Sequence, residues 1–191
     1  MKLKAAAIAL AAALTAAGPA AAEPLFATFQ RLCVDTAGDA TASLAAADAE
    51  GWMPLPRSLM DGLNKNEDFK LQDGRMRSDR EGLSFMLHGG GSQRIGWDRL
   101  DVRMCALGAL PGDAAELRQA TADWVGVEPN ARLSDDDEIT YVFETTDTGR
   151  RAIEDPDDAA VKRLLKAGKV RMIFLKADEE KVLVAYGVPT L

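Results

Sequence analysis

The two cysteines, Cys33 and Cys105, constrain the fold of this chain more than any other feature. Cys33 directly follows a segment, 25–32, whose apolar residues recur at the spacing of one face of a helix. Cys105 directly follows the apolar and polar alternation of 100–104, which predicts a strand. A bond between the two sulfur atoms would join an early helix to a strand in the middle of the chain.

The N-terminal 22 residues predict the compartment in which that bond could form. Two lysines are followed by an apolar run over 5–17 and by three alanines at 20–22, which is the pattern of a cleaved signal peptide. A buried or amphipathic N-terminal helix is the alternative. We expect a signal peptide at 1–22, a single domain at 23–191, and a periplasmic or secreted location. No later stretch has the 18 or so apolar residues of a membrane span.

In an oxidising compartment an isolated cysteine pair predicts a disulfide between Cys33 and Cys105. Closing a loop of about 73 residues stabilises the fold by roughly 4 kcal/mol in the chain-entropy view. A catalytic thiol would need a partnering base, and zinc would need three or four ligands. Both alternatives are weaker because the chain has one histidine, His88.

The charge of the chain limits its partners. Removing the leader takes away two lysines and no acids, so the net charge falls from −7 to −9 over 169 residues. Nucleic acid and anionic lipid both favour basic surfaces, so we expect neither as a partner, and no membrane insertion after cleavage. A cationic protein or a small ligand of the cell envelope is compatible with this charge.

The residue patterns predict one α+β domain: an N-terminal helical hairpin, an antiparallel β-meander, then helix, strand, helix and β-hairpin. Asp73–Gly74 is expected to be a hairpin turn within the meander. Alternation points Cys105 away from the apolar residues before it. We therefore expect the first helix to cover that face of the sheet, rather than a bulge to reverse the alternation. The expected helices cover 25–33, 39–50, 59–63, 113–125 and 155–168, and the expected strands 69–71, 75–77, 83–87, 100–104, 139–143, 170–175 and 182–188.

The stretch His88-Gly89-Gly90-Gly91 matches an oxyanion-hole motif of some lipases. That chemistry also requires a Gly-x-Ser-x-Gly elbow and a later histidine, and the chain has neither. We interpret Gly89–Gly91 instead as a turn after a strand. His88 is expected to be a half-exposed strand residue.

Four residues form a possible anion-binding patch: Arg75, Arg77, Arg103 and His88. Arginine suits carboxylate and phosphate recognition when several guanidinium groups converge. The alternative is a solvated sheet face on which the arginines pair with nearby aspartates and glutamates.

Two further features have weaker functional interpretations. The acidic run 135–138 suggests a cation site, but the residues where an EF-hand has its glycine and distal glutamate are threonines. A solvated loop is the alternative. Trp52, Trp97 and Trp124 could stack on a ligand, but Trp52 and Trp124 lie at apolar helix ends, where core anchoring is the default.

The run Leu32-Cys33-Val34-Asp35, followed by the alanine-rich segment 45–49 and Gly51-Trp52, resembles the opening of small, uncharacterised secreted proteins of alphaproteobacteria. The resemblance covers about residues 26–53 plus Cys105. It implies a small exported domain with a cysteine-bearing helix and a second cysteine late in a strand. It supplies no activity, catalytic residue or cofactor.

No nucleophile, base and orienting group can be assembled around a single histidine. The sequence therefore favours a non-enzymatic binding or envelope-interaction module without a cofactor. The alternative is a small hydrolase that uses carboxylates alone or a metal held by oxygen ligands. These alternatives differ in what they need: an enzyme of that kind requires a deep cleft with acids of raised pKa.

Overall fold

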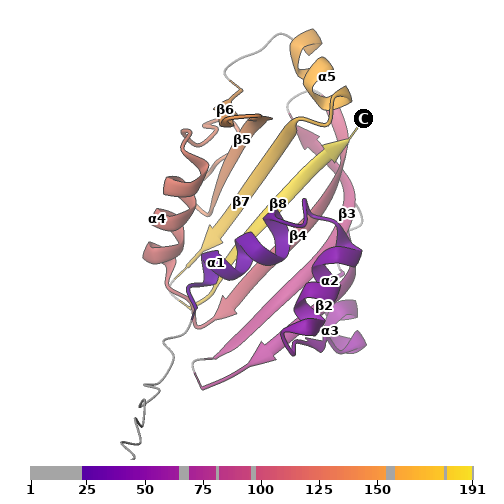
Figure 1. The fold of residues 1–191 in the computed structure, drawn as a ribbon, viewed down its shortest axis with the longest axis vertical. Coiled ribbons are helices and arrows are strands. Elements are labelled where there is room, and N and C mark those ends of the chain that lie inside the picture. The colour runs from indigo at the N-terminus through magenta and orange to yellow at the C-terminus, as the bar shows by residue number, and fades with distance from the viewer. Residues whose placement is uncertain are drawn as a thin grey trace, which may run out of the picture.

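The computed structural model describes residues 23–64, 69–80, 82–95, 98–153, 158–178 and 180–190. One antiparallel sheet organises this part of the chain, with neighbouring strands in the order β1-β2-β3-β4-β8-β7-β5-β6 (Figure 1). Its strands are β1 (Met53–Pro54), β2 (Phe69–Ser78), β3 (Leu83–Ile95), β4 (Asp98–Leu110), β5 (Glu138–Thr146), β6 (Gly149–Ala152), β7 (Val170–Ala177) and β8 (Val182–Thr190). The helices are α1 (Leu25–Phe29), the π-helical turn η1 (Gln30–Val34), α2 (Ala40–Ala49), α3 (Arg57–Leu63), α4 (Ala114–Val125) and α5 (Asp158–Lys166).

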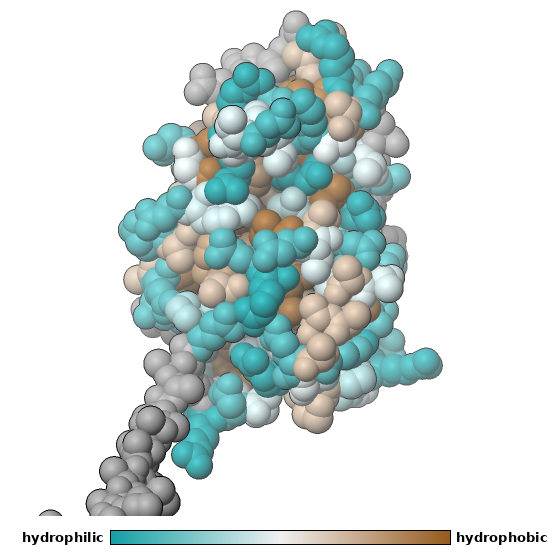
Figure 2. Space-filling view, viewed as in Figure 1, coloured by the Kyte–Doolittle hydropathy of each residue, from teal (hydrophilic) through white to brown (hydrophobic). Residues whose placement is uncertain are grey.

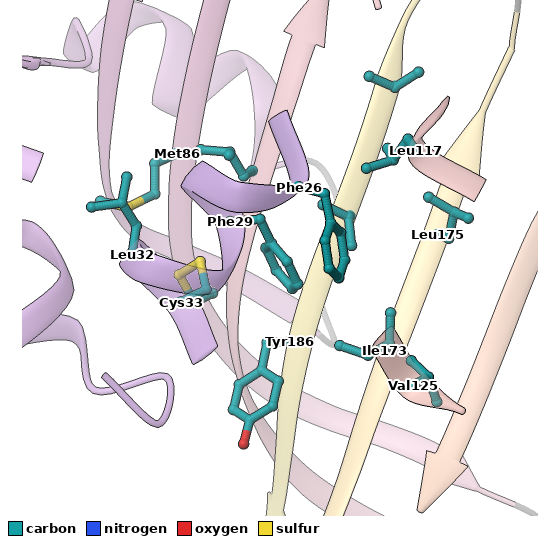
Figure 3. Close-up of a cluster of buried hydrophobic side chains, with 14 of the residues drawn as sticks. Phe26, Phe29, Leu32, Cys33, Met86, Leu117, Val125, Ile173, Leu175 and Tyr186 are labelled. Atoms are coloured by element: carbon teal, nitrogen blue, oxygen red, sulfur yellow. A yellow bond between two sulfur atoms is a disulfide. The ribbon is translucent and has the colours of Figure 1, made fainter. Parts of the chain in front are cut away.

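One face of the sheet carries α1, η1, α2 and α4, and the main core lies beneath them (Figure 1). Phe29 of α1 and Leu32 of η1 are fully buried in this core, which also contains strand residues such as Met86 and Ile173. Figure 3 shows Phe26 and Phe29 pointing from α1 towards β8 and β7. Burial of these large side chains supplies most of the driving force that holds the helices on the sheet.

A disulfide joins Cys33 of η1 to Cys105 of β4, with 5.4 Å between the Cα atoms (Figure 3). Both cysteines are fully buried. Cys105 points into the main core, whereas Met104 and Ala106 point to the opposite face. The predicted disulfide is thus present, and the first helical segment covers the cysteine face as expected.

The opposite face has two smaller apolar clusters. Met60 of α3 packs near Leu87, Ala106 and Ala185, and Leu165 of α5 packs in a separate cluster with Leu100 and Val170. Because apolar residues lie on both faces, β8 is buried along almost its whole length.

The helix ends follow local chemistry. The carboxylates of Asp39 and Asp113 accept hydrogen bonds from the backbone N–H groups of Ala42 and Glu116, each at 2.9 Å, which caps α2 and α4. Gly126, directly after α4, has a φ of +66°, which a glycine adopts without a steric penalty. Helices are thus present where the sequence predicts them at 39–50 and 113–125, and each begins at one of these aspartates. The predicted start of α5, at 155–157, lies outside the described residues.

The prediction of a hairpin turn at Asp73–Gly74 is wrong. Both residues lie within β2, where the pairing with β3 shifts register between Leu71 and Asp73. A β-bulge absorbs the irregularity, and the Asp73 carboxylate accepts a hydrogen bond from the Gly74 N–H at 2.7 Å. The chain reverses later, where the N–H of Asp79 donates to the carbonyl of Gly82 at 3.0 Å.

The prediction of a turn at Gly89–Gly91 is also wrong. These glycines continue β3, which pairs with β2 on one side and β4 on the other. None of the three has a positive φ. Hydrogen bonds from two neighbouring strands outweigh the weak strand propensity of glycine here.

The short strands β1 and β6 leave part of β2 and part of β5 unpaired on one side, and other residues of the chain bond there. The Asn64 side chain both donates to the Leu71 carbonyl and accepts from the Leu71 N–H, as a neighbouring strand would. Ser134 makes the equivalent pair of hydrogen bonds with Thr140 on β5. Such contacts protect a sheet from pairing with a strand of another chain.

Candidate binding cavity

A cavity of about 290 Å³ lies at one end of the sheet. Residues near the ends of β2, β3 and β4, the chain before and within α1, and the start of α4 form its wall. Its apolar wall includes Phe26, Leu83 and Leu117. The volume is at the lower limit of small-molecule pockets, which suits a group of amino-acid size.

Trp52 and Arg77 form the polar centre of this cavity wall. The guanidinium carbon of Arg77 lies 4.9 Å from the centre of the Trp52 ring, which is a cation–π contact. Trp52 is buried, and its indole N–H makes no hydrogen bond of standard geometry within the described chain. The buried Nε of Arg77 likewise has no hydrogen-bond partner there. Buried donors of this kind are normally satisfied. The Trp52 indole N–H lies near the Glu50 carboxylate, whereas the Nε–H of Arg77 would be satisfied by an acceptor in the cavity.

Four carboxylates also line the cavity: Glu23, Asp79, Asp113 and Glu116. Asp113 caps α4, and the Asp79 carboxylate accepts a hydrogen bond from the Gly82 N–H at 3.2 Å. These bonds fix the carboxylates in place without removing their charge.

Arg31 fixes the wall on the N-terminal side. Its guanidinium donates to Glu23 at 2.5 and 2.9 Å and to Glu50 at 2.6 and 3.0 Å. These hydrogen bonds hold the pKa of both carboxyls below the usual range. The Trp52 indole N–H lies near Glu50 and adds to the lowering of its pKa. The first described residue is thereby tied to the end of α2.

Arg75 and His88 of the predicted anion patch lie near one another, because the charge of Arg75 contributes to the lowered pKa of His88. Arg75 donates to Asp48 at 2.6 Å and to Asp73 at 2.7 Å, so its charge is paired. Arg77 lies in the cavity, and Arg103 is exposed on β4. The guanidinium of Arg75 is thus held in ion pairs, as the alternative interpretation of a paired sheet face expects.

His88 is buried, with only 2% of its surface exposed, so the expectation of a half-exposed residue is wrong. Its neighbours in the ladder are Asp73 on β2 and Cys105 on β4, and the helical layer covers the face to which it points. Burial lowers the pKa of His88 to about 4, although Asp73 and Asp39 oppose this shift. Its Nε2 atom has no hydrogen-bond partner among the residues described.

The acidic run 135–138 forms a tight turn. The Asp135 carboxylate accepts hydrogen bonds from the N–H groups of Asp137 and Glu138 at 2.9 and 2.8 Å. Burial raises the pKa of Glu138, and the nearby Asp135 charge adds to this. Within the described ranges, no group of three or more histidine, cysteine or acidic side chains is placed to hold a metal ion.

Trp52 and Trp124 have the anchoring role that the sequence suggested. Trp124 lies edge-on to both Phe26 and Phe143, with ring centres 5.9 and 6.2 Å apart. Arg150 covers the Trp124 ring at 3.8 Å and donates to the carbonyls at the end of α4. Trp97 lies outside the described residues.

No local pattern in the sequence indicates the cavity. Trp52 and Arg77 meet in its wall although the segments that form the wall are far apart in the chain. On the face that carries the helical layer, Figure 2 shows mostly hydrophilic residues, with a weakly hydrophobic area over α2 and α3.

Comparison of the chain with family models, with curated proteins and with solved structures gives no match. Among the helices of the described residues, none has the length and apolar character needed to cross a membrane.

Proposed function

We propose that this chain is an exported, non-enzymatic binding module of the bacterial envelope, periplasmic or secreted, which holds a small ligand in the cavity beside Trp52 and Arg77. In this proposal the leader at 1–22 is removed, and the N-terminal helical hairpin is fixed to the sheet by the Cys33–Cys105 bond. The module works without a cofactor, and neither nucleic acid nor the bilayer interior is its partner.

The cavity carries this proposal. It combines an apolar wall with the buried Nε–H of Arg77, which has no hydrogen-bond partner in the described chain, and with the Trp52 ring beside it. Such a combination is typical of a binding site in which a few polar groups orient the ligand.

The alternative, a hydrolase that uses carboxylates alone, needs an acid of raised pKa near a second carboxylate. The pKa of Glu23 in the cavity is lowered, because Arg31 donates hydrogen bonds to it. The carboxyl of Glu138, whose pKa is raised, belongs to β5 and does not line the cavity. This distribution favours binding over acid catalysis.

A fragment screen by protein NMR tests the binding role. The oxidised, processed protein is titrated with small cationic, neutral and anionic fragments, and the indole N–H of Trp52 and the backbone N–H of Gly112 are followed. We expect saturable shifts confined to the cavity wall for at least one class of fragment. If every class leaves these signals unchanged at millimolar concentration, the binding proposal fails.

A further inference from the structure

The charges around the cavity favour one class of ligand. Four carboxylates and the guanidinium of Arg77 line it. Arg31 pairs with one of these carboxylates, Glu23, and the remaining charge of the wall is still negative. Arg77 is the positive group, but it lies over the Trp52 ring and near Glu50, whose pKa it helps to lower. Cleavage after Ala22 would add the α-ammonium group of Glu23, and the balance would remain negative.

The uncharged parts of the wall restrict the ligand further. Phe26, Leu83 and Leu117 favour an apolar body of modest size. The Arg77 Nε–H has no acceptor among the described residues, and a carbonyl oxygen would provide one. A cation that lacked an apolar body or an acceptor would leave part of this wall unmatched.

We infer that the cavity binds an amino-acid-sized ammonium compound with an apolar side chain and a carbonyl group, as at the N-terminus of a peptide. The ammonium group lies among the carboxylates of Asp113 and Glu116, and the side chain lies against Phe26 and Leu83. The carbonyl accepts from Arg77. This inference rests on the proposed binding function and names the ligand class for the same cavity.

Three matched probes test the inference on the oxidised, processed protein. L-phenylalaninamide is a cation, N-acetyl-L-phenylalaninamide is neutral, and N-acetyl-L-phenylalanine is an anion; all three share a phenyl ring and a carbonyl. Binding is followed by the NMR shifts of the Trp52 indole N–H and the Gly112 backbone N–H. We expect the cation to bind at least tenfold more tightly than the other two probes.

A charge-removal variant links any binding to the carboxylates. Asp113→Asn with Glu116→Gln removes two charges, and asparagine caps a helix as well as aspartate does. We expect about a tenfold weaker affinity for the cation, about threefold for each charge. Asp136→Asn with Asp137→Asn removes two exposed charges from a loop that does not line the cavity, and it should leave the affinity unchanged.

The outcomes separate this inference from the proposed function. If the neutral or anionic probe binds at the cavity as tightly as the cation, the ligand class is wrong while the binding function stands. The ligand class is also wrong if the two double variants weaken binding equally, or if none of the three probes binds. In the last case, the fragment screen decides whether the binding function survives.

Discussion

The burial of His88 predicts that the protein loses stability in mild acid. Its imidazole is 2% exposed, and burial lowers its pKa from 6.5 to about 4. One unit of pKa corresponds to 1.36 kcal/mol. The lower pKa of His88 in the folded state therefore corresponds to about 3 kcal/mol of stability. This is a large part of the 5–15 kcal/mol by which typical domains are stable.

The direction in which stability changes with pH follows from proton binding to His88. Below pH 6.5 the unfolded chain takes up a proton on His88, whereas the folded chain resists protonation until the pH reaches about 4. The contribution of His88 to stability is therefore fully present above pH 6.5, and it is lost as the pH falls to about 4.

Urea unfolding at pH 7.0, 5.5 and 4.0 measures this loss, with His88→Leu as the comparison. The variant fills a similar volume and removes the titrating group. Carboxyls with lowered pKa, such as Glu23 and Glu50, also lose stability in acid, but they do so in both proteins. The wild-type free energy of unfolding should fall by about 3 kcal/mol more than that of the variant between pH 7.0 and 4.0. Parallel pH profiles of the two proteins would refute this account of His88.

Three further predictions concern stability. The double variant Cys33→Ala with Cys105→Ala removes a link across 72 positions. It should lower the free energy of unfolding by about 4 kcal/mol in urea titrations without reductant. A loss below about 1 kcal/mol would contradict the structural role of the bond. Gly108→Ala places a Cβ 2.3 Å from the Phe85 ring and should destabilise by about 1–3 kcal/mol in thermal unfolding. Gly62→Ala, in α3 with open space around the new Cβ, should instead stabilise the protein by up to about 1 kcal/mol. Equal effects of the two glycine variants would argue against the close packing at Gly108.

Local chemistry explains what could be predicted from the sequence. Asp39 and Asp113 cap helices because a short acceptor side chain reaches the free N–H groups of the next turn. The alternation around Cys105 was enough to predict which face of the strand the first helix covers. In both cases, residues close together in the chain decide the outcome.

Long-range pairing explains the errors. The sequence Asp73–Gly74 favours a turn, and so do three consecutive glycines, but each stretch pairs with a strand that is distant in the sequence. His88 was misjudged for the same reason, because distant helices cover it. The cavity depends on several separated segments, so no local pattern could have predicted it.

Export and closure of the Cys33–Cys105 disulfide underlie the proposed function. Mass spectrometry of the intact protein from the periplasmic fraction or the medium, under non-reducing conditions, tests both at once. We predict the mass of residues 23–191 less two hydrogens, unchanged by an alkylating reagent. A chain that keeps residues 1–22, or one that takes up two alkyl groups before reduction, would contradict the account.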